Sequence, residues 1–377
     1  MTAKGFFKYG LGALALLALA LGLKSVGALA QGGASLPPEL DNAYIRDLAA
    51  KARAEGGVIR SYGMPNDWAN YGEIFAEFQR LFGIRQQDID MGSAVVLSRM
   101  REEKASKNDI ADLKPSFAMV LAEEGLTLPY RVTSWVALPE GQKGVGKDGS
   151  TWYAGYKGTL GWIVNTRLVK KVPRTWKELE NPEYKGLIQY LDPRATGTGV
   201  ATIMAAAYAL TGDPYNYKAG VDFFARLHRL GVIGSVEPKV TTAKFERGEV
   251  GILINYDYNL LAWKERFPFP TEVVIPQDGT LAGGGGIVAA RNAPHPNTAK
   301  LFLEFIFSRY GQALFAKAFV SPIRPDVELP KEVAAKFPPK SAYAKVRFVD
   351  YKVRFVDYKK EAAVSEALQK YYGETIR

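Results

Sequence analysis

The 377-residue sequence contains no cysteine and only two histidines, His228 and His295. Without cysteine the chain has no disulfide, no thiolate nucleophile and no N-terminal cysteine to carry a lipid anchor. With two histidines, a transition-metal site built from histidine and cysteine is not expected. Long basic runs are missing as well, so we do not expect nucleic acid as a partner.

Long apolar runs are also missing, except near the N-terminus. Two lysines precede an apolar run over residues 9–23, and Ala28-Leu29-Ala30 follows as an A-x-A cleavage signal. The run is shorter than the roughly 20 residues that cross a bilayer. We therefore predict that residues 1–30 are a signal peptide, cleaved near Ala30-Gln31, and that the mature chain is periplasmic without a lipid anchor.

The charge of the mature chain is mildly basic. Removing the three lysines of the export segment leaves 46 basic and 39 acidic residues, a net charge of +7. This excess suits an anionic ligand, and it equally suits solubility.

Predicted strands and helices alternate along the chain. Strands are expected at 58–62, 89–91, 152–156, 161–165, 186–191, 250–255 and 272–275, and helices at 42–55, 68–82, 94–104, 200–210, 220–230 and from about 298 onward. This alternation predicts parallel sheets covered by helices, and the length predicts two of them.

We therefore predict an α/β fold of two doubly wound lobes joined by a crossover hinge. Lobe 1 comprises 31–158 and 283–377, with C-terminal helices that partly bridge both lobes, and lobe 2 comprises 159–282. The crossings are expected at 157–160 and 278–286. The heptapeptide KVRFVDY occurs twice in succession, at 345–351 and 352–358, and we assign no function to this duplication.

Catalytic motifs are poorly supported. Residues 141–147 match the first seven positions of a phosphate-binding P-loop, but Asp148 stands where a Ser or Thr hydroxyl is needed. A G-x-S-x-G elbow is missing, and neither histidine lies in a context typical of a catalytic triad. A pair of carboxylates facing each other across a cleft remains open, so a secreted hydrolase stays as an alternative.

Three junctions between a strand and a helix share one pattern. Each places a small polar residue, Asp67, Ser93 or Thr198, at an expected helix start, where it caps the helix or contributes to a binding site. In doubly wound folds such junctions cluster at the carboxyl ends of the strands. Backbone N–H groups and the positive end of each helix dipole then favour an anion.

A fourth polar cluster follows the apolar strand at 250–255. Its amide and phenol groups are suited to orienting a ligand in a cleft. Together the four segments give these candidate ligand-binding residues: Ser61, Tyr62, Asn66, Asp67, Ser93, Arg99, Arg194, Thr196, Gly197, Thr198, Gly199, Asn255, Tyr256, Asp257 and Tyr258.

An ordered set of motifs resembles the type II extracellular solute-binding proteins of ABC importers. The motifs are GGVIRSYGMPNDWANY, DIDMGSAVVLSRMREEK, DIAD at 109–112, GTLGWIVNTRLV, TWKELENPEYKGLIQYLDPRATGTG, FERGEVGILINYDYN and AKLFLEFIFSRYGQALFAKAFVSPIRPDVELP. The resemblance implies two lobes that close on a ligand, the transmembrane subunits of an ABC importer as partners, and no catalysis. We expect a monomer.

The resemblance extends to binders of ferric ion, polyamines, thiamine and organic anions. Ferric-ion binders carry two adjacent tyrosines after the strand that matches 251–254, whereas this chain has Asp257-Tyr258 there. We predict a small anionic solute, rich in carboxylates and taken up as a metal–citrate-type complex with Mg²⁺ or Ca²⁺. Ferric ion, a phosphorylated solute and a polyamine are the alternatives, and a scaffold module without a ligand is another.

Overall fold

The computed structural model describes residues 35–104, 107–343, 345–348 and 357–376. The predicted signal peptide and most of the KVRFVDY tandem lie outside these residues. Across the described ranges, no helix combines the length and the apolar character that crossing a bilayer requires.

Helices account for much of the described chain, and short 3-10 turns connect several of them. The helices are α1 (Ala43–Ala54), α2 (Tyr71–Phe82), α3 (Ser93–Glu102), α4 (Pro115–Glu123), α5 (Gly197–Thr211), α6 (Tyr217–Arg229), α7 (Ala243–Glu246), α8 (Asp257–Arg266), α9 (Pro296–Ile306), α10 (Arg309–Lys317), α11 (Lys331–Ala334) and α12 (Asp357–Thr375).

The first sheet has six strands in the order β2-β1-β3-β12-β5-β4. Strands β1, β2 and β3 run parallel, whereas β12, β5 and β4 add antiparallel pairs. The bounds are β1 (Val58–Tyr62), β2 (Arg85–Ile89), β3 (Ile110–Leu113), β4 (Lys143–Val145), β5 (Thr151–Ala154) and β12 (Gly286–Ala289).

The second sheet has eight strands, with the path β14-β11-β6-β9-β7-β8 and with β10 and β13 also paired to β6. Strand β7 runs parallel to β8 and β9, while β6 is antiparallel to β9, β10, β11 and β13. The bounds are β6 (Tyr156–Asn165), β7 (Ile188–Leu191), β8 (Ile233–Glu237), β9 (Ile252–Tyr256), β10 (Thr271–Val274), β11 (Thr280–Gly283), β13 (Ser321–Pro322) and β14 (Val346–Phe348).

The predicted α/β fold with two sheets is confirmed, but the expectation of parallel sheets is wrong. Both sheets are mixed, because the strands that pass between them return in the opposite direction. Some boundaries also differ. The second strand lies at Arg85–Ile89 rather than 89–91, and the strand expected at 152–156 is split between β5 and β6.

The chain passes between the two sheets at two adjacent places. Gly155 connects β5 to β6, and Gly284-Gly285 connect β11 to β12. The Gly155 N–H donates to the carbonyl of Gly285 at 2.8 Å. A Cβ on Gly284 would lie 1.8 Å from the Tyr156 carbonyl oxygen, so only glycine allows this close approach. The crossings thus lie near 157–160 and inside 278–286, and the lobe boundaries themselves stay predictions.

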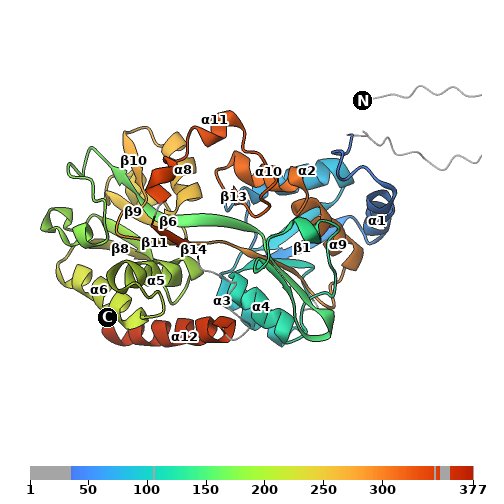
Figure 1. The fold of residues 1–377 in the computed structure, drawn as a ribbon, viewed down its shortest axis with the longest axis horizontal. Helices are drawn as coiled ribbons and strands as arrows, with labels where there is room; N and C mark the ends of the chain where they lie inside the picture. Colours follow the sequence, from blue (N-terminus) through green and yellow to red (C-terminus); the bar gives the residue numbers. More distant parts are fainter. Residues whose placement is uncertain (1–34, 105–106, 344, 349–356, 377) are drawn as a thin grey trace, which may run out of the picture. The chain divides into compact units, whose positions relative to one another are not determined.

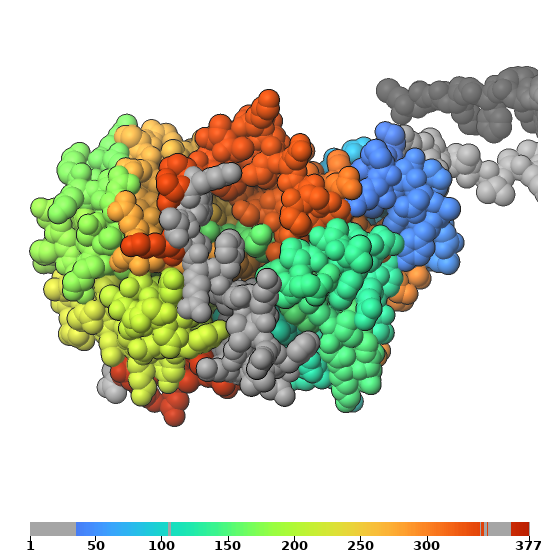
Figure 2. All heavy atoms as spheres, viewed as in Figure 1, coloured from blue at the N-terminus to red at the C-terminus, as the bar shows by residue number. Residues whose placement is uncertain are grey.

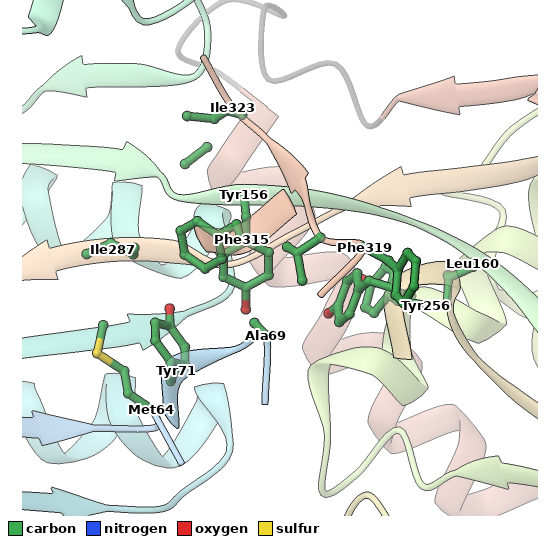
Figure 3. Close-up of a cluster of buried hydrophobic side chains, with 14 of the residues drawn as sticks. Met64, Ala69, Tyr71, Tyr156, Leu160, Tyr256, Ile287, Phe315, Phe319 and Ile323 are labelled. Atoms are coloured by element: carbon green, nitrogen blue, oxygen red, sulfur yellow. The ribbon is translucent and has the colours of Figure 1, made fainter. Parts of the chain in front are cut away.

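The apolar face predicted for 68–82 forms the buried side of α2. Phe75 stacks on Phe302 of α9 with ring centroids 4.8 Å apart, and Phe78 meets the same ring edge-on at 5.3 Å. Figure 3 shows the neighbouring part of this core, where Tyr71 of α2 and Phe315 of α10 lie near Tyr156 at the start of β6. The core therefore reaches the strand that links the two sheets.

The C-terminal helix α12 packs against α6 and α5 and also against α4 (Figure 1). The Gln369 amide donates to the Pro193 carbonyl at 3.0 Å, and the Tyr371 hydroxyl donates to Asp222 at 2.9 Å. In the space-filling view, blue to teal residues of the first sheet and its helices gather on one side, and light green to yellow residues of the second on the other (Figure 2).

Candidate ligand-binding site

A cavity of about 320 Å³ lies where strands of both sheets end. Its walls come from the segments that follow β1, β2 and β3 of the first sheet and β7, β8 and β9 of the second. The start of β6 and the crossing at 284–285 complete it. The lining residues are Gly63, Pro65, Asp67, Trp68, Asp90, Met91, Gly92, Ser93, Asp112, Leu113, Lys114, Tyr156, Leu191, Ala195, Thr196, Gly197, Thr198, Pro238, Lys239, Val240, Tyr256, Tyr258, Gly284 and Gly285. Carboxyl ends of strands are where doubly wound folds bind ligands.

Two helix N-termini face each other across this cavity. A Cβ on Gly92, which precedes α3, would lie 2.8 Å from the Ala195 carbonyl oxygen, in the segment before α5. A Cβ on Gly197 would lie 3.6 Å from the Ser93 hydroxyl. Among the described residues, no acceptor takes the backbone N–H groups of Ser93, Gly197 or Thr198. These donors and the two helix dipoles favour an anion between the walls.

Three carboxylates line another part of the cavity. Asp112 is 6% exposed, and its side chain accepts hydrogen bonds on Oδ2 from the hydroxyls of Tyr71 at 2.8 Å and Tyr156 at 2.7 Å. Burial raises the pKa of Asp112 to about 7, although the two phenols act in the opposite direction. Burial and the charge of Asp67 raise the pKa of Asp90, and Lys239 lowers it.

Aromatic side chains form the wall next to Asp112. The Trp68 indole N–H donates to the Tyr156 hydroxyl at 2.7 Å, and its ring forms a T-shaped pair with Tyr258 at 5.7 Å between centroids. Tyr258 also stacks on Tyr256 at 5.5 Å. Tyr258 is 1% exposed, yet its hydroxyl has no hydrogen-bond partner among the described residues. A buried hydroxyl without a partner is costly, so a polar ligand atom is a fitting complement.

Comparison with known proteins decides the family. Residues 106–352 match the family described as bacterial extracellular solute-binding protein. The chain belongs to this family. As a member of a solute-binding family it is a binding protein and not an enzyme, which removes the hydrolase alternative.

Relatives of this solute-binding protein differ in what their names state. An uncharacterized protein of Haemophilus influenzae is 33% identical over 202 residues, which are 51% of this chain and 56% of that protein. The chain thus spans only about half the length of that relative. A Salmonella typhimurium protein, provisionally named as a periplasmic 2-aminoethylphosphonate-binding protein, is 25% identical over 70% of this chain and 76% of its own length.

Solved structures share the fold. The periplasmic binding protein AfuA from Actinobacillus pleuropneumoniae, solved with fructose-6-phosphate bound, superposes with a TM-score of 0.71 at 23% identity. The match covers 85% of this chain and 99% of that protein. The fold that the resemblance implied is therefore confirmed.

Seven of the fifteen candidate residues line the cavity of this solute-binding protein. They come from four of the segments that follow strands, and they are Asp67, Ser93, Thr196, Gly197, Thr198, Tyr256 and Tyr258. The comparisons do not address individual residues, so their contact with a ligand stays a prediction.

Four candidates from the first half of the chain lie outside the cavity lining. The buried Ser61 hydroxyl donates to Asp88 at 2.7 Å, and the Tyr62 hydroxyl donates to Glu103 at 2.9 Å. Arg99 lies over the Tyr62 ring at 5.6 Å, and Asn66 is exposed. For Ser61, Tyr62 and Arg99, hydrogen bonds or ring contacts within the protein explain why they do not face the cavity.

The other four candidates outside the cavity lining also have hydrogen-bond or ion-pair partners within the protein. Arg194 forms an ion pair with Asp192 at 2.6 Å, and the Gly199 N–H donates to the Thr196 hydroxyl at 3.0 Å. Asn255 accepts from the Asn259 amide at 3.0 Å. Asp257, the first residue of α8, accepts from the Thr159 backbone N–H at 2.9 Å. Each group therefore has a structural partner.

The expected helix caps are wrong at all three junctions. The N-cap positions are Asn70, Gly92 and Thr196, and only the Thr196 side chain accepts a helix N–H. Ser93 lies one position inside α3, and its hydroxyl accepts from the Lys114 backbone N–H at 3.1 Å. The expectation failed because the helices begin at other residues than expected. Helix α2 begins only after the turn at 66–70, and helices α3 and α5 already include Ser93 and Thr198.

Sequence reasoning missed Asp90, Asp112, Lys114, Tyr156 and Lys239. Asp90 and Lys114 directly follow β2 and β3, Asp112 is the penultimate residue of β3, and Lys239 lies two residues after β8, so the strand-end rule applied to every strand would have found these four. Tyr156 begins β6, and nothing in its local sequence indicates that it faces a cavity.

Proposed function

We propose that this chain captures a small organic phosphate or phosphonate in the cavity and presents it to an ABC importer. The observation that carries the proposal is the pair of facing helix N-termini, α3 and α5, whose first backbone N–H groups have no acceptor within the described chain. A tetrahedral oxyanion accepts from several N–H groups at once, which makes it a natural occupant of such a site.

The two walls belong to elements of different sheets, so the anion touches both. A ligand that contacts both walls binds more tightly to the state in which the walls are close, and this difference in affinity drives closure around the ligand. A cavity of about 320 Å³ lies at the lower end of the range for small-molecule sites. The named or bound solutes of two relatives, 2-aminoethylphosphonate and fructose-6-phosphate, support the same class.

This proposal replaces the metal–citrate expectation with one of its alternatives. No comparison supports metal–citrate, and in the described part of the chain no three His, Asp or Glu side chains gather as a metal site. Ferric ion is also disfavoured, because the Asp257 carboxylate bonds to backbone N–H groups. A Mg²⁺ or Ca²⁺ ion arriving with the solute stays a prediction.

Titration calorimetry on the mature chain tests the proposal. We expect binding of at least one compound among inorganic phosphate, ethylphosphonate, 2-aminoethylphosphonate and fructose-6-phosphate, and no binding of citrate, with or without Mg²⁺, or of putrescine. Citrate binding without any phosphorus compound would refute the proposal. Transport by a reconstituted importer would test the delivery step.

A pair of lysine variants locates the anion. Lys239 lines the cavity, whereas Lys244 pairs with Glu237 outside the lining. We expect Lys239→Gln to weaken phosphorus-compound affinity about three- to tenfold, more at low salt, and Lys244→Gln to leave it unchanged. Equal effects of both variants would show that only the net charge matters.

A further inference from the structure

Asp112 is a buried carboxylate that the protein does not neutralise. Within the described residues no lysine or arginine forms an ion pair with it, and its two donors are the neutral phenols of Tyr71 and Tyr156. Both donate to Oδ2, and Oδ1 has no donor in the described chain. A buried charge is normally paired, so Oδ1 is a candidate acceptor for a donor group of a ligand.

Other buried acids of the chain show how unusual this is. Asp109 accepts from the backbone N–H groups of Arg60 and His295 and lies 2.9 Å from the His295 imidazole. Both oxygens of Glu304 accept from protein donors, among them the Tyr130 hydroxyl and the Thr133 backbone N–H. Neither of these acids lines the cavity, and Asp112 does.

The groups around Asp112 add negative and aromatic character. Tyr71 comes from α2, Tyr156 from β6, Tyr258 from α8 and Asp88 from β2, and the charge of Asp88 disfavours ionisation of Asp112. Asp67, Asp90, Lys114 and Lys239 line the same cavity. None of the groups that shift the pKa of Asp112 is a cation.

Three aromatic side chains, Trp68, Tyr156 and Tyr258, line the cavity together with Asp112. Trp68 and Tyr156 each form a T-shaped pair with Tyr258, at 5.7 and 6.1 Å between ring centroids, and the Trp68 N–H donates to the Tyr156 hydroxyl. Aromatic faces attract an ammonium group, above all where water is excluded. The unpartnered Tyr258 hydroxyl in the same wall is a second, independent sign that a polar ligand group completes this region.

We infer that the solute carries a primary ammonium group, which binds Asp112 and the surrounding rings while the phosphorus oxyanion lies between the N-termini of α3 and α5. The solute class is then the aminoalkyl phosphonates and aminoalkyl phosphate esters. This inference rests on the proposed function, since it assigns the second charged end of the same ligand.

Matched ligands test the inference by calorimetry on the mature chain. The pairs are 2-aminoethylphosphonate against ethylphosphonate, and phosphoethanolamine against ethyl phosphate. We expect the amine to bind about tenfold tighter or more in each pair, because it adds a hydrogen bond between charged groups in a buried site.

Asp112→Asn supplies the matched variant, because asparagine keeps an oxygen for the two phenols. It should reduce the affinity for the amines to that of their amine-free partners and should not weaken the amine-free compounds. Asp222→Asn is the control, since Asp222 also accepts from a phenol, that of Tyr371, but lies outside the cavity lining.

Proton exchange gives a readout on the unaltered protein, should Asp112→Asn not fold. Titrations near pH 7 in buffers of different ionisation enthalpy count the protons exchanged on binding. An ammonium favours ionised Asp112, so the amine should release more protons than its amine-free partner, whose oxyanion alone favours proton uptake. The ammonium also lowers the pKa of the ligand's own phosphorus group, so each free ligand is titrated separately and its own proton exchange is subtracted before the two are compared.

The outcomes separate the two proposals. Equal affinity and equal proton exchange within each pair would overturn the ammonium assignment and leave phosphate or phosphonate capture intact. If none of the four compounds binds, and neither inorganic phosphate nor fructose-6-phosphate binds, both the ammonium assignment and the proposed capture of a phosphorus compound are overturned. Tighter binding of the amines that persists in Asp112→Asn would also refute the assignment to Asp112.

Discussion

Alanine in place of Gly92 should prevent the two walls of the cavity from meeting. The new Cβ would lie 2.8 Å from the Ala195 carbonyl oxygen, well inside ordinary contact distance. Gly92 itself has φ −69° and ψ 155°, which alanine adopts without strain, so the backbone of the free protein tolerates the change. The penalty falls on the approach of the two loops.

Overpacking by one methyl group typically costs about 1–3 kcal/mol. If that cost is confined to the closed state, ligand affinity falls about 5- to 150-fold. Calorimetry with the tightest phosphorus compound measures the loss, and small-angle scattering shows whether the ligand still makes the protein more compact.

Gly197→Ala is the matched control on the facing wall. It introduces the same methyl group, but its Cβ would lie 3.6 Å from the Ser93 hydroxyl, an ordinary contact. We expect affinity close to that of the unaltered protein. If both variants bind equally well, the contact between Gly92 and Ala195 does not limit closure and the reasoning fails.

Three further predictions concern the cavity and its contents. Tyr258→Phe removes a buried hydroxyl without a partner, so it should leave the free protein as stable or more stable to urea, and a loss of about 1 kcal/mol or more would contradict this. The pKa of Asp112 is raised to about 7, so between about pH 4 and 7 the folded state holds a proton that the unfolded state has lost. The free energy of unfolding should therefore fall by up to about 4 kcal/mol as the pH rises through this range. In Asp112→Asn the free energy of unfolding should depend less on pH. If Mg²⁺ or Ca²⁺ accompanies the solute, EDTA dialysis should weaken binding, and unchanged calorimetry would exclude the ion.

The fold was largely predictable because its signals are local. Apolar spacing along α2 and the glycines that end α1 and α2 are visible in a short window of sequence. The direction of the strands was not predictable, because it depends on pairing between distant segments. Strand β12 pairs with β3 from more than 170 residues away and enters the sheet antiparallel. Periodicity identifies such a strand without fixing its direction.

The anion wall, which is formed by the N-termini of α3 and α5, was predictable for a similar reason. Glycine and hydroxyl residues at the start of α5 indicate a helix N-terminus, and the fold rule then places it at the cavity. The exact cap positions were missed, since the N-caps are Asn70, Gly92 and Thr196 and not Asp67, Ser93 and Thr198. Arg99 and Arg194 show the opposite error, since a cation near a site in sequence pairs with its own neighbours in space.

The proposed ammonium end differs in kind, because it is assembled from side chains of several elements around the crossing strand. Asp112 lies in β3, Tyr156 begins β6, Trp68 precedes α2 and Tyr258 lies in α8. An anion site built from backbone N–H groups depends little on side-chain identity, whereas the proposed ammonium end depends on the side chains of these four residues. If the two ends bind as proposed, relatives with the same anion wall differ in solute mainly through these positions. Grafting a neutral residue at Asp112 and hydroxyl-bearing residues beside it should then shift preference from amines toward sugar phosphates, and unchanged preference in the matched titrations would refute this division.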